Sequence, residues 1–152
     1  IRADADEAGS ANVLGHAVVV TSRTELDGLD GGEAGILLGQ GLRIRGFENL
    51  DGSITATQLT GQSSPVGNEI TVQGVVKAFD ASARTITVLG VTLNAVGAAA
   101  FGPHEGTGLD HPPVSLDQFF SLLTAGRTVV KAEGSFSPGP PPLLTAVSIE
   151  IE

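Results

Sequence analysis

The feature that most constrains this chain is an internal repeat marked by two copies of the tripeptide Val-Leu-Gly. Val13-Leu14-Gly15 and Val88-Leu89-Gly90 lie 75 positions apart, and residues 1–19 align with residues 76–94 without a gap. Self-similarity at a fixed spacing is typical of chains made of repeated structural units. The sequence therefore predicts two related units.

The pattern of apolar residues changes phase at each of these glycines. Ile86 and Val88 share one face of a strand, whereas Val91 and Leu93, after the glycine, have the opposite parity. A β-bulge at Leu89-Gly90 would absorb one residue and bend the strand into a small barrel. We expect the bulge; two short strands joined by a tight glycine turn are the alternative.

Composition favours strands with frequent turns, because the 152 residues include 21 glycines and many β-branched residues. We expect a first repeat over residues 1–62, a linker over 63–69 and a second repeat over 70–152. The first repeat lacks the strand that Ile70–Val75 supplies to the second. We expect that strand either upstream of Ile1 or from another segment.

One helix is predicted, at about residues 115–125. Ser115 and Gln118 have the spacing of a capping box. The apolar face of this helix has helical spacing and consists of Leu116, Phe119, Phe120 and Leu123. The second repeat then reads as three strands, the helix and two strands, which is the order of a five-stranded Greek-key barrel of the OB type. The fold class is therefore mainly β, with two tandem small OB-like barrels; another all-β barrel topology remains open.

These segments resemble the bacterial DUF5666 family, a domain of unknown function. The opening motif of the family is similar to Ile70–Val76, followed by Asp80 and Ile86–Val91. The closing motif is similar to Leu123–Gly126, Val130–Gly134 and Thr145–Ile149, and in the first repeat to Leu42–Gly46 and Asp51–Thr57. The resemblance implies tandem copies in exported or envelope-associated proteins, and hence a periplasmic or extracellular location.

Several classes of function are disfavoured by composition. The net charge of −9 repels phosphate backbones, and the absence of Trp and Tyr leaves few aromatic platforms for bases, so we expect no nucleic-acid binding. Without cysteine there is no disulfide, thiolate zinc site or cysteine nucleophile. No apolar run has the length of a membrane helix, and neither a Gly-x-Ser-x-Gly elbow nor a phosphate-binding loop is present.

The strongest candidate site in the sequence is the Gly/Pro-rich loop of residues 98–113. Its possible metal ligands are His104, Glu105, Asp110 and His111. Imidazole and carboxylate groups can hold zinc or another divalent ion. Because the spacing is not a standard one, solvated loop histidines are the favoured interpretation.

Two acidic segments and one further histidine are weaker candidates. Asp27, Asp30 and Glu33 fail the spacing of a calcium loop, and Asp4, Asp6 and Glu7 are interpreted in the same way, as acidic turns. His16 is expected on a strand surface.

The function expected from these observations is a non-catalytic binding or structural module that needs no cofactor. Its partner would be a protein or an envelope component, possibly added as a strand to the incomplete first repeat, and a homo-oligomer is possible. The alternative is a metal- or small-ligand-binding module that uses the 98–113 loop.

Overall fold

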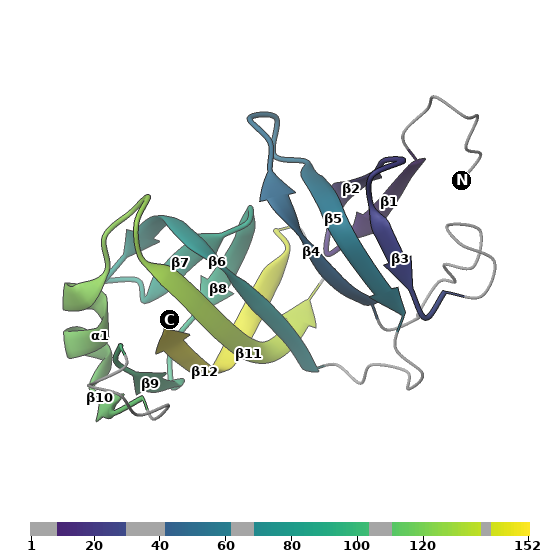
Figure 1. Cartoon of the computed structure of the whole chain (residues 1–152). Coiled ribbons are helices and arrows are strands. Elements are labelled where there is room, and N and C mark those ends of the chain that lie inside the picture. Colours follow the sequence, from purple (N-terminus) through teal and green to yellow (C-terminus); the bar gives the residue numbers. More distant parts are fainter. Residues whose placement is uncertain (1–8, 30–41, 62–68, 104–110, 138–140) are drawn as a thin grey trace. The chain divides into compact units, whose positions relative to one another are not determined.

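The computed structural model describes residues 9–29, 42–61, 69–103, 111–137 and 141–152. The chain is mainly β-strand with one short helix, as predicted. It divides into two compact units, Ile1–Gly67 and Asn68–Glu152, and each is described by itself (Figure 1). Residues 63–68, which make up most of the predicted linker, lie outside the described residues. In the described part of the chain, no helix is long and apolar enough to cross a membrane.

Five strands of the C-terminal unit close into a barrel (Figure 1). These strands are β6 (Glu69–Asp80), β7 (Thr85–Val88), β8 (Val91–Asn94), β11 (Val129–Ser137) and β12 (Leu143–Ile151). β6, β7 and β8 form an antiparallel meander, and β11 lies antiparallel between β6 and β12. Parallel pairing of β8 with β12 closes the ring.

Inward-facing apolar residues fill this barrel because successive side chains of a strand point to opposite faces. The largest fully buried side chains of the unit are Val76, Ile86, Val88, Leu93, Val130, Leu144, Ile149 and Phe119. No polar or charged residue is buried in the described part of the chain. Burial of apolar area is therefore the main stabilising term of this unit.

The helix α1 spans Leu116–Leu122 and begins as predicted. The Ser115 hydroxyl accepts a hydrogen bond from the backbone N–H of Gln118, 3.1 Å away. Phe119 and Phe120 are buried, and the Phe120 ring lies 6.2 Å from that of Phe79, between ring centroids. The helix ends earlier than predicted because Leu123 adopts extended backbone angles.

The N-terminal unit is a separate five-stranded sheet (Figure 1). Its strands are β1 (Gly9–Val13), β2 (His16–Val20), β3 (Glu25–Asp27), β4 (Leu42–Glu48) and β5 (Ile54–Gly61). β1 and β2 form a hairpin, β2 and β3 pair in parallel with β5, and β4 runs antiparallel to β5. Within the described residues no pairing joins β1 to β4. The barrel predicted for residues 1–62 is therefore not closed there.

The two units share a pattern of strand pairing. In the parallel pairs, Val18 is opposite Ile54 and Leu93 is opposite Leu144. The antiparallel pair β4–β5 shifts register between Arg45 and Gly46, and β11–β12 shifts between Glu133 and Gly134. At both glycines the carbonyl oxygen of a facing threonine, Thr55 or Thr145, leaves no room for a Cβ atom. One register of pairing thus occurs in both units.

The bulge predicted at the Val-Leu-Gly tripeptides is wrong, and the alternative, a tight turn, is observed. Leu14 and Gly15 have φ of 53° and 83°, and Leu89 and Gly90 have φ of 49° and 74°. Two successive positive φ values define the type I′ turn that joins two strands through a two-residue loop. The loop itself accounts for the change in parity, because the strands on either side are separate elements.

Two expectations for the C-terminal unit need correction. The 98–113 segment is not only a loop, because β9 (Ala99–Phe101) pairs in parallel with β12 and β10 (Pro113–Val114) pairs with β9. Val147 has the same strand parity as the buried Ile149 and Ile151, which predicts a place on the inner face, but it is 67% exposed. It lies opposite the register shift at Glu133/Gly134, where the extra residue of β12 reverses the side-chain parity.

Candidate functional site

In the described part of the N-terminal unit, the clearest candidate site is the backbone along β1 and β4. In the C-terminal unit, the matching strands β7 and β11 both pair with β6, which bridges them. In the N-terminal unit, β1 pairs only with β2, and β4 only with β5, among the described strands. We call the remaining sides of β1 and β4 the open edges. Unpaired N–H and C=O groups along such edges are a template for another strand.

Side chains beside the open edges are less buried than their counterparts in the barrel. Val13 and Ile44 are half-buried against a core of Val18, Val20, Ala56 and Leu59. Their counterparts, Val88 and Ala132, are fully buried beneath β6. Among the described residues, no strand of the N-terminal unit covers its core in the way that β6 covers the C-terminal core.

His16, which is expected on a strand surface, lies at the start of β2. It is only partly exposed there. By strand parity its side chain faces the same side as Val18, and its Nε2 is buried with no hydrogen-bond partner in the described part of the chain. The matching residue of the second hairpin, Val91, is buried. A buried polar atom without a partner is a destabilising feature.

A second candidate site lies on the C-terminal unit, around His111. The His111 Nδ1 donates to the carbonyl oxygen of Gly102, 2.9 Å away, and its Nε2 lies 3.9 Å from Glu150 Oε2. One ligand atom each from His111, Glu150 and Glu152 lies within 4.8 Å of the other two. These residues meet because β9, which ends just before Gly102, pairs with β12 beside Glu150.

Lys131 occupies one side of this cluster. Its Nζ lies 2.7 Å from Glu150 Oε1 and 3.5 Å from Glu133 Oε1. The hydrogen bond from Lys131 lowers the pKa of Glu150 below its ordinary value, although partial burial opposes the shift. The same hydrogen bond raises the pKa of Lys131. The carboxylates of Glu133, Glu150 and Glu152 outnumber the one ammonium group, that of Lys131, so this group of side chains is anionic.

The sequence anticipated only one member of this cluster. His104, Glu105 and Asp110 lie outside the described residues, as do Asp4, Asp6, Glu7, Asp30 and Glu33. Glu150 and Glu152 went unnoticed because they are far from His111 in sequence. The available signal was their alternation with the buried Ile149 and Ile151, which places both carboxylates on the outer face of β12.

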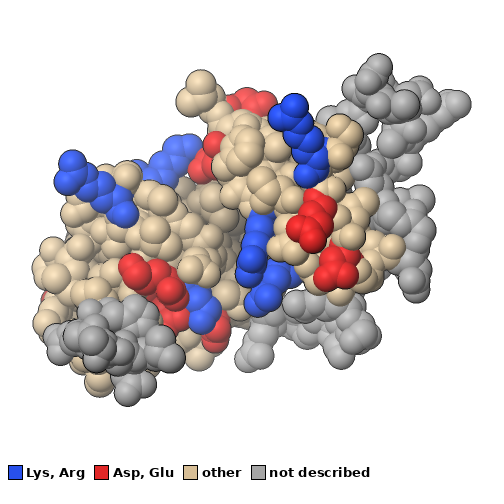
Figure 2. All heavy atoms as spheres, in the orientation of Figure 1, with Lys and Arg blue, Asp and Glu red and all other residues tan. Residues whose placement is uncertain are grey.

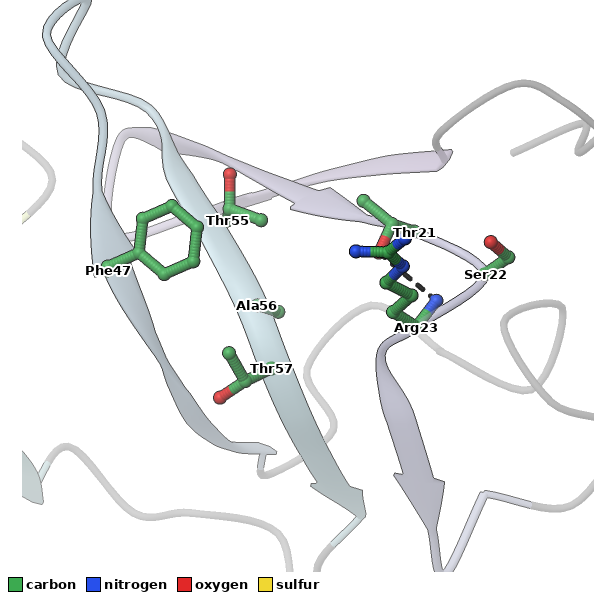
Figure 3. Close-up of a pocket in the computed structure, with 7 residues that line it drawn as sticks. All are labelled: Thr21, Ser22, Arg23, Phe47, Thr55, Ala56 and Thr57. Carbon is green, nitrogen blue, oxygen red and sulfur yellow. Dashed lines mark hydrogen bonds between the residues drawn. The ribbon is translucent and has the colours of Figure 1, made fainter.

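A hollow on the N-terminal unit is a further candidate site. It is lined by Thr21, Ser22, Arg23, Phe47, Thr55, Ala56 and Thr57 (Figure 3). The Phe47 ring lies beside β5, and the backbone N–H of Arg23 donates to the Thr21 hydroxyl, 3.2 Å away. Among the described residues of the lining, Arg23 is the single ionisable group, so these residues include no acid–base pair.

Together the fold and these sites define a mainly β protein with a closed five-stranded barrel in its C-terminal part and a separate N-terminal sheet. Residues 2–60 match the family described as domain of unknown function (DUF5666), so the N-terminal part of the chain is a DUF5666 domain. No curated protein and no solved structure matches the chain significantly. The match covers the N-terminal unit, whereas the resemblance seen in the sequence drew on both units.

Proposed function

We propose that this chain is a non-catalytic binding or structural module of an exported bacterial protein, made of two related OB-like units. In this proposal the N-terminal unit binds a protein partner by adding one of its strands to the open edges. The observation that carries the proposal is that β1 and β4 share no neighbour among the described strands, whereas β7 and β11 share β6. Export rests on the DUF5666 likeness alone.

Strand order and register support the OB-like interpretation. In the C-terminal unit a three-stranded meander is followed by a helix and two further strands, and the third strand pairs in parallel with the last. This is the order of the five-stranded Greek-key barrel. Among its described residues, the N-terminal unit has counterparts of the barrel strands other than the first. Its pairing of Val18 with Ile54 and its register shift at Gly46 match those of the C-terminal unit. Duplication of one domain explains both patterns.

Charge supports a protein partner over nucleic acid. The net charge of −9 opposes binding to a phosphate backbone. On the face shown in Figure 2, basic and acidic side chains of the N-terminal unit lie side by side, without a broad basic surface. Strand addition relies on backbone hydrogen bonds and needs no such surface.

Amide hydrogen exchange on the 152-residue chain tests the proposed function. Thr85 and Thr87 of β7 face β6, pairing with Asp80 and Ala78. Ser10 and Asn12 hold the same hairpin positions in β1. We expect slow exchange at Thr85 and Thr87 and exchange at least tenfold faster at Ser10 and Asn12. Equal protection in dilute protein would contradict the proposal, because the open edges would then already be filled.

A second candidate function, binding of a divalent cation, is favoured by the His111 cluster. The Nδ1–H bond to Gly102 fixes the imidazole and leaves Nε2 directed towards Glu150, as is common for histidine ligands. Carboxylate oxygens of Glu150 and Glu152 would complete three protein ligands. Zn²⁺ titration should raise the melting temperature of the chain, and both His111→Ala and Glu152→Gln should abolish the rise. An equal rise in the double variant would exclude this cluster.

A further inference from the structure

We infer that the open edges select a strand with the pattern apolar-x-Gly-x-apolar, antiparallel to β1 and β4, with acidic residues preferred at its outward positions. The inference rests on the proposed function and specifies the chemistry of the partner strand. The filled edges of β7 and β11 in the C-terminal unit show which residues of an added strand would face the open edges.

The two apolar positions follow from how β6 covers its barrel. Val72 and Val76 point inward and are buried. Val72 is paired with Ala132 of β11, and Val76 with Val88 of β7. In the N-terminal unit the residues matching Ala132 and Val88 are Ile44 and Val13, and both are half-buried. A strand with apolar side chains four positions apart would cover both.

The central glycine follows from the turn between β7 and β8. A Cβ at Gly74 would lie 3.0 Å from Leu89 Cγ and 3.0 Å from Val88 Cγ1. Leu89 therefore packs over β6 where β6 has no side chain. Leu14 has the same place in its own turn and nearly the same φ, 53° against 49°. A larger residue at the central position of an added strand would meet Leu14 and Val13.

The acidic preference follows from the outward residues of β4. Thr71 and Gln73 of β6 are paired with Glu133 and Lys131 of β11. The residues of β4 that match Glu133 and Lys131 in register are Arg45 and Arg43, and both are exposed. Opposite charges directly across a strand pair attract. A carboxylate at either outward position would face an arginine.

Three alternatives to this site and this partner are less well supported. The hollow beside Phe47 has one charged group and nothing that selects a ligand. Exposed Leu50 and Phe47 form no recognisable motif. Pairing of two copies through their β4 strands would bring Arg43 and Arg45 of both copies close together, which is electrostatically unfavourable. A strand from a different protein, with β6-like chemistry, fits the open edges best.

Peptide binding to the 152-residue chain tests the inference. The probe is a fluorescent synthetic peptide with the sequence of residues 69–80. We expect saturable binding seen by fluorescence anisotropy, with new amide protection at Ser10 and Asn12. The peptide change Gly74→Val should weaken binding at least tenfold, and Val72→Ser with Val76→Ser should do the same. The peptide change Gln73→Glu should tighten binding severalfold, and Arg43→Ala in the chain should remove that gain.

Each contrary result has a distinct meaning. If Ser10 and Asn12 are protected before the peptide is added, a segment of the chain or a second copy fills the edges, and the proposed function fails with the inference. Dilution separates those two cases, because protection by a second copy falls with concentration. If the edges are open but the Gly74→Val peptide binds as well as the parent, only the inference fails. Changes in amide protection that are confined to β7 and β11 would also overturn the inference, because the peptide would then be displacing β6.

Discussion

At the residue scale, two glycines hold the same position of closest strand approach in the two units. A Cβ built on Gly134 would lie 2.0 Å from the carbonyl oxygen of Thr145, and one on Gly46 would lie 2.2 Å from that of Thr55. Both contacts are with backbone, which cannot rotate away. These glycines are therefore needed by the register shift itself, and not for flexibility.

Substitution at Gly134 should consequently be costly. We expect Gly134→Ala to lower the free energy of unfolding by about 3 kcal/mol, the upper end for overpacking. The control is Gly97→Ala, where nothing lies within 4 Å of the added Cβ but φ is +78°. It should cost about 1 kcal/mol, from the left-handed backbone alone. Urea unfolding measures both, and a smaller loss at Gly134 than at Gly97 would contradict the steric account.

A substitution at His16 should raise the free energy of unfolding instead of lowering it. Replacing it by valine, the residue at the matching position 91, removes a buried nitrogen that has no partner among the described residues. We expect His16→Val to raise the free energy of unfolding by about 1 kcal/mol. Thermal unfolding at neutral pH is the measurement. A lower melting temperature would show that the imidazole makes a contact that stabilises the unit.

The pair Lys131–Glu150 should make stability depend on pH in acid. Because the pKa of Glu150 is lowered from an ordinary 4.5, the folded state binds its proton less readily than the unfolded state does. The stabilisation is therefore complete above about pH 4.5 and is lost as the pH falls through the lowered pKa. Urea unfolding of the parent and of Glu150→Gln should differ at pH 7 and converge towards pH 3. A constant difference would contradict this linkage.

At the element scale, the sequence was most informative where a local rule decides the structure. The capping of α1 by Ser115 and the burial of Phe119 and Phe120 were both predicted from spacing. The turns at Leu14 and Leu89 were misjudged because parity alone does not distinguish a bulge from a two-residue loop. The cluster of His111 with Glu150 was not predictable, since it depends on the pairing of β9 with β12.

The helix cap gives a prediction at this scale. Ser115→Ala removes the acceptor for the Gln118 N–H and should cost about 1 kcal/mol. Ser121→Ala is a matched control in the same helix, because its hydroxyl donates to an i−3 carbonyl, that of Gln118, and caps no terminus. Denaturant unfolding should show the larger loss for Ser115. Equal losses would mean that the cap contributes nothing specific.

At the scale of the whole molecule, the described sheet of the N-terminal unit lacks one strand of the barrel that the C-terminal unit closes. The C-terminal barrel is closed by β6, whereas the described N-terminal sheet has the corresponding pairings of its other strands and no counterpart of β6. In our proposal, this difference allows the N-terminal unit to accept a strand from a partner, whereas the C-terminal barrel is already closed. It also explains why Val13 and Ile44 stay half-buried while their counterparts are covered.

Supplying the absent strand covalently is the most direct test of this account. A copy of residues 69–80 would be fused ahead of Ile1 through a flexible linker. We predict that amides Ser10 and Asn12 become protected and that the melting temperature of the N-terminal unit rises by at least about 4 °C, the shift expected per kcal/mol for a unit of this size. The same fusion carrying Gly74→Val in the added copy should show neither effect. If the intact fusion leaves both properties unchanged, the N-terminal unit is not an acceptor for a β6-like strand.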